Sequence, residues 1–440
     1  MDSSDEWFYK NHIMQRSSSD DSSDDDDSDG LVATLIVNEY IERMRPVFLG
    51  SLPGRSPALD RNRRAGQIQL YGDYFRPHKP TYPPKVFRRR FRMRRSLFNR
   101  IRVGVMHFDD YFMCKPDACG MRGFSSYQKC TAAIRMLAYG IAGDLVDEYV
   151  RMSESTCLEA MYKFCAAVVQ VFGTEYLREP NAADMTRLLA INESRGFPGM
   201  LGSIDCMHWE WRNCPFAWQG QYKGHVGACT VILEAVASQD LWIWHSFFGM
   251  AGSHNDINVL QRSPVFNRLS NGLAPQVTFE INGNQYDKPY YLADGIYPTW
   301  TTFVKTISNP NDEKKKRFAK EQESARKDVE RAFGALQSRW AIVRHPARTW
   351  DKDQLWEVMT ACVIMHNMIV EDERDEGLND QAWQFRGELV QPQGPSTFAQ
   401  FLDFHRDIRE KESHVRLQND LVEHVWQHYG NQGDQGDQGQ

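Results

Sequence analysis

At 440 residues the chain is long enough for more than one compact domain and a large core. Its 41% hydrophobic content is ordinary for a globular protein. No apolar run approaches the roughly 20 residues that span a bilayer, and the first 30 residues are polar, so we expect neither a membrane segment nor a signal peptide. The nine cysteines include no CxxC pair, which argues against a disulfide scaffold or a zinc ribbon.

The net charge of −6 is unevenly distributed, because seven aspartates lie between Asp20 and Asp29. Residues 1–30 therefore read as a disordered acidic tail. Residues 31–84 are expected to be a linker or arm, and this segment ends in the Pro-rich stretch RPHKPTYPP.

A basic segment follows, with nine Lys or Arg and no acid between Lys85 and Arg102. Such a segment suits DNA phosphates, and the run RRRFRMRR could also serve as a nuclear import signal. The candidate DNA-binding residues here are Arg88, Arg89, Arg90, Arg92, Arg94 and Arg95. The alternative is a solvated basic helix that packs Phe87, Phe91, Leu97 and Phe98 inward.

Residues 85–180 are predicted to form an all-α domain. From Ser125 the pattern gives a helix over 125–143, a short one over 144–152 and a longer one over 155–173, with Thr156 and Glu159 as a capping box. This arrangement is typical of a helix-turn-helix, whose third helix would enter a major groove. Three-helix packing without DNA contact is the alternative, and the sequence favours neither.

Residues 195–375 are predicted to form an α/β domain with a mixed sheet. Strands are expected in GSIDCMHW, Cys229–Ser238, Leu241–Met250, the hairpin Gln276–Tyr286 and Tyr290–Pro298, and helices over Asp312–Trp340 and Gln354–Glu373. Residues 376–429 are expected to be a C-terminal helical region, and residues 430–440 a flexible tail.

Three acids occupy positions that could meet at one edge of this sheet. Asp205 lies within the first strand, Asp294 ends the strand YYLAD, and Glu330 borders the apolar stripe of the long helix. Three converging carboxylates repel one another, and one or two Mg²⁺ ions would remove that repulsion. Two such ions can activate a water or a 3′-hydroxyl and stabilise the leaving oxygen of a phosphodiester.

The motifs GSIDCMHWEW, GMAGSHNDINVL, YYLADGIYP and ARKDVERAFGALQSRW, in this order, resemble the PIF/Harbinger superfamily of transposases, especially its plant members. The resemblance covers about residues 85–429. It implies a ribonuclease-H-like fold and a DDE acid triad that uses a divalent metal, Mg²⁺ or Mn²⁺, to cut and join DNA. Mapped onto this chain, the catalytic and metal-binding triad is Asp205, Asp294 and Glu330.

Asp256, in GSHNDINVL, competes for the second position of the triad. We favour Asp294 because it ends a strand expected to lie beside the first one, whereas an aspartate at a helix start is more often a cap. Asp256 stays open as an accessory metal ligand or as a residue that orders His254.

The chain is also similar to bacterial insertion-sequence transposases with an arginine before the glutamate, here Arg326-x-x-x-Glu330. An ion pair within the helix is the simpler interpretation of Arg326. Those enzymes carry a tyrosine and a lysine where this chain has Glu323 and Gln337. Arg339 or Lys327 would have to supply the missing phosphate contact.

His208, Trp209 and Trp211 follow the first acid of the triad. His208 could contact a DNA phosphate, and the tryptophans could stack on unpaired bases. Filling the core beside the sheet is the more frequent role of such residues.

The first functional hypothesis is a nuclear, metal-dependent DNA transposase or endonuclease. The resemblance adds a Myb-like DNA-binding protein as a partner, and a homo-oligomer is a further expectation. The second hypothesis is a host-adopted transposase that binds DNA or chromatin without nuclease activity. A ribonuclease or phosphatase on the same fold is a weaker third option.

Overall fold

The structure, a computed structural model, describes residues 59–116, 120, 122–224, 227–264, 276–374, 387–390 and 406–430. The chain divides into two units, Met1–Asp60 and Arg61–Gln440, and every element below belongs to the second. The expected tails at 1–30 and 430–440 lie outside the described residues, except for Gly430, which is helical.

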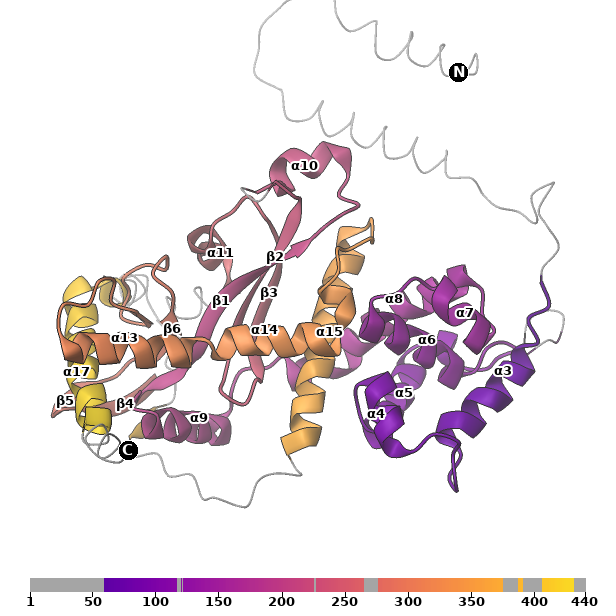
Figure 1. The fold of residues 1–440 in the computed structure, drawn as a ribbon, viewed down its shortest axis with the longest axis horizontal. Coiled ribbons are helices and arrows are strands. Elements are labelled where there is room, and N and C mark those ends of the chain that lie inside the picture. Colours follow the sequence, from indigo (N-terminus) through magenta and orange to yellow (C-terminus); the bar gives the residue numbers. More distant parts are fainter. Residues whose placement is uncertain are drawn as a thin grey trace, which may run out of the picture. The chain divides into compact units, whose positions relative to one another are not determined.

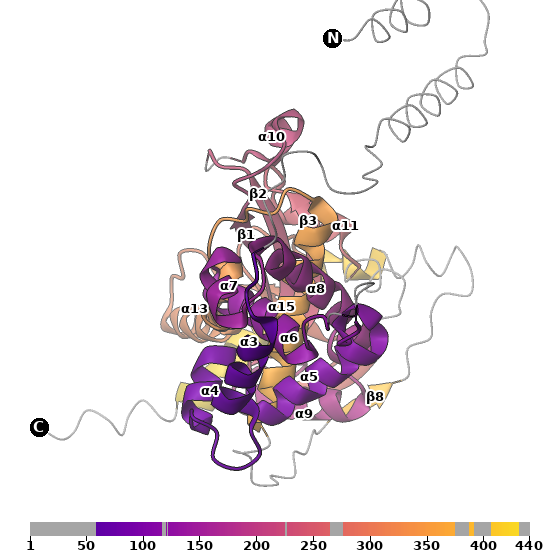
Figure 2. The ribbon, with the colours of Figure 1, turned by 90° about the vertical axis from the view of Figure 1, so that its right-hand side faces the viewer.

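An N-terminal helical region precedes the sheet (Figures 1 and 2). Its elements are α3 (Arg63–Leu70), η2 (Tyr71–Phe75), α4 (Pro84–Phe91), α5 (Arg95–Phe108), η3 (Asp110–Phe112), α6 (Ser126–Tyr139), α7 (Asp144–Val150), α8 (Glu154–Tyr176) and α9 (Ala182–Ser194). The segment 63–75, expected to be part of a linker, is therefore helical. It folds because Leu70, Tyr74 and Phe75 are buried in the core of this region.

An aromatic cluster holds η2, α4 and α5 together. The ring of Phe75 lies 4.9 Å from that of Phe98, and Phe87 stacks on Phe91 at 4.2 Å between centroids. Aromatic pairs at such distances stabilise a core beyond their buried area. The inward packing of Phe87, Phe91, Leu97 and Phe98 is confirmed, since all four are buried.

The ends of α6 and α8 are capped by local side chains. A capping box joins Ser125 to Gln128 at the start of α6, and Gly140 ends the helix with a φ of 63°. The expected capping box of Thr156 and Glu159 is wrong, because the cap of α8 is Ser153, which accepts from the backbone N–H of Thr156.

Helix α8 is enclosed by its neighbours, packing against α5 and α6 on one side and against α15 (Lys352–Arg374) on the other. Between Thr156 and Gly173, only Glu159 and Gln170 are exposed. A recognition helix needs a polar, accessible face to contact base edges. The packing limits the accessible surface of α8 to a few positions, among them Glu154 and Ser155 at its start, and the major-groove interpretation of this helix stays a prediction.

A mixed five-stranded sheet forms the centre of the α/β domain, in the order β3-β2-β1-β6-β7. The strands are β1 (Met200–Glu210), β2 (Thr230–Ala237), β3 (Ile243–Ala251), β6 (Tyr290–Ala293) and β7 (Phe303–Lys305). β1, β2 and β3 pair antiparallel, whereas β6 runs parallel to both β1 and β7. A helical region followed by such a sheet is the expected α/β architecture, consistent with a ribonuclease-H-like fold.

Helices cover both faces of the sheet. α14 (Asp328–Arg339) and α15 pack on one face against β1, β2 and β3, while α11 (Asp256–Arg262) contacts β2. Alternation along β1 assigns side chains to these faces. Ser203 contacts the start of α14, whereas Ile204 packs with Val236 and Leu260 in the other core.

The predicted long helix is two helices, α13 (Glu313–Arg326) and α14, which meet at Lys327. The stripe of Val329, Phe333, Leu336 and Trp340 is buried, as predicted. The junction follows from Asp328, whose buried carboxylate is bound by an arginine of another element and fixes the start of α14.

A second sheet has three strands in the order β5-β4-β8. Its central strand shares a hydrophobic core with residues of β1 and β6 from the five-stranded sheet. The second sheet contains β4 (Gln276–Ile281), β5 (Asn284–Tyr286) and β8 (Glu388–Val390), and α17 (Lys411–Gly430) packs against β4 and α13. The predicted turn at Asn282 and Gly283 is confirmed, with φ values of 53° and 87°. Helix α10 (Phe216–Tyr222), between β1 and β2, was not predicted.

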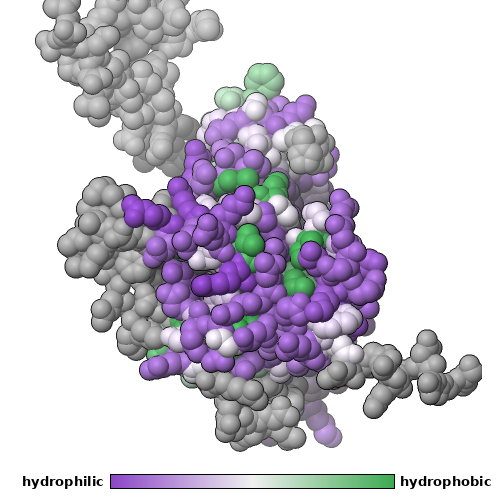
Figure 3. Space-filling model, turned by 90° about the vertical axis from the view of Figure 1, so that its left-hand side faces the viewer, coloured by the Kyte–Doolittle hydropathy of each residue, from purple (hydrophilic) through white to green (hydrophobic). Residues whose placement is uncertain are grey.

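In the described part of the chain, no helix has the length and apolar character that crossing a bilayer requires. Figure 3 shows a side of the molecule on which hydrophilic residues predominate and hydrophobic ones form small, separate spots. That surface is mainly hydrophilic and carries no continuous apolar patch among the residues coloured in the figure.

Candidate active site

The parallel pairing of β1 and β6 places two of the predicted acids beside each other. Ser203 lies opposite Leu292 in this ladder, and two residues further along each strand come Asp205 and Asp294. Asp294 directly follows β6, and its Oδ1 accepts from the backbone N–H of Ile296 at 3.0 Å. The expectation that the Asp294 strand neighbours the Asp205 strand is confirmed.

Asp205 is a half-buried carboxylate whose side chain is 19% exposed. Its Oδ1 accepts from the backbone N–H of Cys206 at 2.8 Å, and its Oδ2 lies 3.6 Å from Nη1 of Arg326. The pKa of Asp205 is raised to about 6, chiefly by burial and also by the neighbouring Asp294 and Asp256, while the hydrogen bond from Cys206 N–H and the charge of Arg326 oppose the shift. The side chain can therefore carry or release a proton near neutral pH.

Glu330 stands in the first turn of α14, on the same side as Asp205. Its Oε1 lies 2.9 Å from Nη1 of Arg326, the nitrogen that also approaches Asp205, and its side chain is 43% exposed. Arg326 closes α13, so this ion pair spans the junction of two helices and also reaches β1. It is more than the simple pair within one helix that the sequence allows.

Asp256 also lies near this group of acids. Burial raises its pKa, and the charge of Asp294 raises it again. The N-cap of α11 is Asn255, whose Oδ1 accepts from Asn258 N–H at 2.9 Å, so Asp256 is not the cap. The structure brings both Asp256 and Asp294 close to Asp205, and the choice between them stays a prediction.

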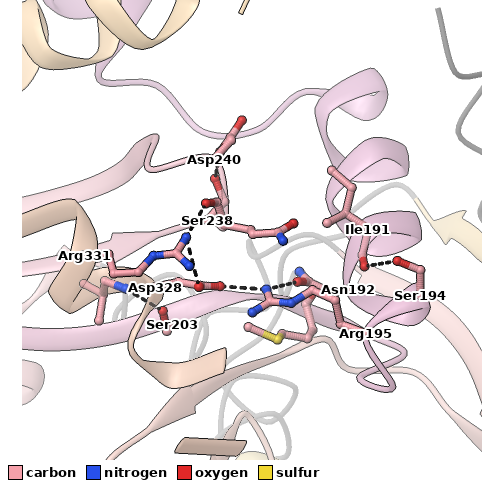
Figure 4. Close-up of polar contacts among 12 residues, drawn as sticks. Ile191, Asn192, Ser194, Arg195, Ser203, Ser238, Asp240, Asp328 and Arg331 are labelled. Carbon is pink, nitrogen blue, oxygen red and sulfur yellow. Dashed lines mark hydrogen bonds and ion pairs between the residues drawn. The ribbon is translucent and has the colours of Figure 1, made fainter. Parts of the chain in front are cut away.

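A buried ion network fixes the helix that carries Glu330 (Figure 4). Asp328 has no exposed surface, and its Oδ2 lies 2.7 Å from Nη1 of Arg195, while Arg331 approaches Oδ1 at 3.4 Å. The Ser203 hydroxyl accepts from the backbone N–H of Val329 at 3.1 Å. Ser203 lies two residues before Asp205 on β1. The same strand therefore carries Asp205 and, through Ser203, holds the start of the helix that carries Glu330.

The donor chemistry of this group fits a hard divalent cation, because carboxylate oxygens are its preferred ligands. The charges of Asp294 and Asp256 contribute to the raised pKa of Asp205, and that of Asp294 contributes to the raised pKa of Asp256. As placed, however, no three His, Cys, Asp or Glu side chains among the described residues are grouped closely enough to hold a metal. Arg326 instead supplies the positive charge between Asp205 and Glu330.

A hollow of about 830 Å³ opens along α13 and α14 beside Glu330. Lys320, Lys327 and Arg331 contribute three positive charges to its lining, against Glu323 and Glu330. Lys327 is thus well placed for a phosphate contact. Arg339, the other candidate, is bound instead by Glu373 at 2.6 Å and by His366.

Several arginines of the basic segment have acidic partners on α15. Arg88 lies 2.5 Å from Glu373, and Arg94 lies 3.4 Å from Asp372. Arg95 lies over the ring of Phe87 at 5.4 Å. These contacts connect the helical region to the sheet domain, which leaves Arg89, Arg90 and Arg92 as the better candidates for an external anion.

The residues after Asp205 divide into one exposed and two buried side chains. Trp209 and Trp211 are buried, and their indole N–H groups donate to the carbonyls of His345 and Thr349 at 2.8 Å. They are core residues. His208 is exposed, with Nδ1 2.9 Å from the Thr230 hydroxyl, and so remains accessible to a ligand.

Sequence reasoning missed Glu234, a fully buried acid opposite Cys206 on β2. Its Oε1 lies 3.1 Å from Nε2 of His245, and its Oε2 has no hydrogen-bond partner among the described residues. The signal was a single acid within the apolar run TVILEAVA, because a strand buried on both faces rarely includes one unless it is paired.

Comparisons with known proteins agree with this arrangement. Residues 174–377, which contain all the candidate acids, match the family described as plant transposon protein. Residues 66–105 match a domain of unknown function. The Arabidopsis thaliana relative named protein ALP1-like is 24% identical over 320 residues, covering 68% of this chain and 73% of that protein. No solved structure matches the chain significantly. Over residues 174–377, the chain is therefore similar to the plant transposon proteins.

Proposed function

We propose that the chain is a metal-dependent DDE transposase that hydrolyses one DNA strand at a transposon end and joins the resulting 3′-hydroxyl to target DNA. The proposal is supported by the adjacent strands that carry Asp205 and Asp294, and by Arg326, which pairs with both Asp205 and Glu330. Asp294 and Asp256 contribute to the raised pKa of Asp205, and carboxyls perturbed by burial and like charges are common at functional sites.

Asp205 and Asp294 would hold Mg²⁺ or Mn²⁺, with Glu330 and Asp256 as the nearest further oxygen donors. The bound ion would supply the activation of a water or hydroxyl and the stabilisation of the leaving oxygen. Because the pKa of Asp205 is about 6, this carboxyl is mostly ionised at pH 7 and ready to bind a cation.

The DNA strand would be held by the positive side chains around the acids. Lys320, Lys327 and Arg331 line the hollow beside Glu330, where they would neutralise phosphates next to the scissile bond. Arg326 would keep Glu330 turned toward Asp205. Exposed His208, three residues after Asp205 on β1, would contact a further phosphate.

Partners and location follow from the same proposal. DNA is the substrate, a Myb-like protein would supply recognition of the transposon ends, and a second copy of the chain would pair the two ends. The nucleus is the proposed location, with the Arg88–Arg95 run as import signal.

A host-adopted, catalytically silent DNA-binding protein is the second candidate. Its supporting observation is Arg326, whose guanidinium already neutralises Asp205 and Glu330. Terminal inverted repeats and a short target duplication flanking the gene would favour the transposase.

The test is nicking of DNA carrying the element ends in Mg²⁺ or Mn²⁺. Asp205→Ala should reduce nicking by at least about 10³-fold while DNA affinity changes little, since binding is supplied by other residues. Asp287→Ala removes an acid that is 79% exposed and serves as the matched control, with activity retained. Equal nicking by wild type and Asp205→Ala would end the catalytic assignment.

A further inference from the structure

A second positively charged hollow lies in the helical region, away from the acids. It has a volume of about 520 Å³, and Arg89, Arg90, Arg92 and Arg135 line it. The remaining lining residues are uncharged: Tyr139, Ile141, Leu145 and Val146. Four guanidinium groups and no acid in one lining repel each other, and an anion would relieve that repulsion.

Arg135 of α6 is the buried member of this set, with 7% of its surface exposed. Its Nη2 donates to the Tyr74 hydroxyl at 3.3 Å, and its guanidinium lies 4.4 Å from the ring centre of Tyr149. The nearby acid Asp73 accepts from Tyr149 rather than pairing with the arginine. The Nε of Arg135 has no hydrogen-bond partner within the described part of the chain. A buried charge that contacts aromatic rings and one hydroxyl, with no acidic partner among the described residues of its hollow, has capacity left for an anionic ligand.

Arg92 is held at the same hollow by an unusual backbone conformation. Its φ of 63° lies in the left-handed region, which a residue with a Cβ adopts only at a cost in free energy. Its Nη2 donates to the Ala138 carbonyl at 3.3 Å, and its guanidinium lies 5.1 Å from the ring of Tyr139. The Nε atoms of Arg90 and Arg92 are buried without hydrogen-bond partners in the resolved structure.

We propose that this hollow binds a phosphate group of a DNA strand. Planar guanidinium groups with spare donors bind phosphate oxygens in pairs. The apolar rim of Tyr139, Ile141 and Leu145, the last 69% exposed, lies where a sugar or base next to that phosphate would pack. The site anchors DNA on the helical region through α4 and α6 rather than through α8. The choice of DNA as the source of the phosphate rests on the proposed function. The inference does not require that the chain cleaves DNA.

The test measures binding of a fluorescent 20-base-pair duplex to the full chain by anisotropy, in EDTA and over a range of salt concentrations. An Arg89→Gln/Arg90→Gln double variant should raise Kd about tenfold and reduce the salt dependence by about two phosphate contacts. Arg89→Gln alone, at an exposed position, should raise Kd about threefold and remove about one contact.

An Arg64→Gln/Lys85→Gln variant is the matched control, because it removes two exposed positive charges of the same region outside the hollow. Its Kd should stay within twofold of wild type. An unchanged Kd and salt slope in the Arg89→Gln/Arg90→Gln variant would overturn the proposal, and so would an equal loss in the control.

A measurement with inorganic phosphate distinguishes a site for DNA phosphates from a site for free phosphate. If it raises the Tm of wild type but not of the Arg89→Gln/Arg90→Gln variant, while both bind DNA equally, the hollow is a site for free phosphate and the DNA assignment fails. Because binding is measured without metal, a silent nuclease would leave the result intact, so the two proposals fail independently.

Discussion

Charged side chains are organised differently in the helical region and at the edge of the five-stranded sheet. In the helical region, many arginines of a conspicuously basic segment are satisfied: Arg88 by Glu373, Arg94 by Asp372, and Arg100 by Glu175. At the sheet edge, Asp294 is far from Asp205 and Asp256 in the sequence, yet its charge contributes to the raised pKa values of both. The dense run of positive charge thus serves largely to join two regions, whereas the acids at the sheet edge share a single arginine, Arg326, which pairs with Asp205 and Glu330.

The difference teaches where to look for function in this protein. A charge whose partner lies within the fold contributes to stability, whereas a charge held near like charges costs stability and is retained for another reason. By this criterion the four arginines of the helical hollow belong with the acids of the sheet edge, and Arg88, Arg94 and Asp328 belong with the structural charges.

The largest expected effect contrasts two buried aspartates. Asp328→Asn should lower the free energy of unfolding by about 3 kcal/mol, because it leaves the charge of Arg195 without its buried partner. Asp205→Asn should raise it by about 2 kcal/mol at pH 8 without metal, because the folded state no longer ionises a carboxyl whose pKa is raised.

Urea unfolding at two pH values measures both effects. The folded pKa of Asp205, about 6, lies above the ordinary value of 3.8, so the folded state binds the proton more tightly. The stabilisation by Asp205→Asn should therefore be complete above pH 6 and vanish below about pH 4. Lys314→Gln, at an exposed ion pair with Glu423, is the control and should change stability by less than about 1 kcal/mol. If both aspartate variants shifted stability in the same direction, the distinction between structural and functional charges would be lost.

A smaller effect is expected from Arg88→Gln. The ion pair of Arg88 with Glu373 is partly exposed, at 46% and 32% of the two side chains, so its loss should cost about 1 kcal/mol or less. DNA affinity should stay within about twofold of wild type, since the side chain already has an acidic partner. Anisotropy and urea unfolding on the same variant decide this, and a large loss of affinity with unchanged stability would place Arg88 with the DNA-binding arginines.

Much of the α/β domain could be predicted because its strands follow simple patterns. β1, β2 and β3 are apolar runs with clear ends, and Asn282-Gly283 is a turn by its backbone requirements alone. The pairing of the strand of Asp205 with the strand that precedes Asp294 could be predicted from the expected order of the strands. The break at Lys327 could not be predicted, since it depends on Arg195, 133 residues away from Asp328.

The basic segment shows the other limit of sequence reasoning. Its composition indicates a partner for positive charge but not whether that partner is DNA or the acidic end of α15, where Glu371, Asp372 and Glu373 lie. The contribution of Arg135 was equally hidden, because an arginine within the helix SYQKCTAAIRMLAY carries no sign of the hollow that α4 completes. Long-range pairing decides both cases.

Calorimetric titration of Mn²⁺ into the folded chain tests the central claim most directly. At pH 7.5 wild type should take up the ion, Asp205→Asn and Asp294→Asn should lose it, and exposed Asp287→Asn should retain it. Below pH 6 the affinity of wild type should fall by about tenfold per pH unit, as Asp205 becomes protonated. No uptake by a well-folded wild-type sample, or equal uptake by all four proteins, would contradict a shared metal site at this edge of the sheet.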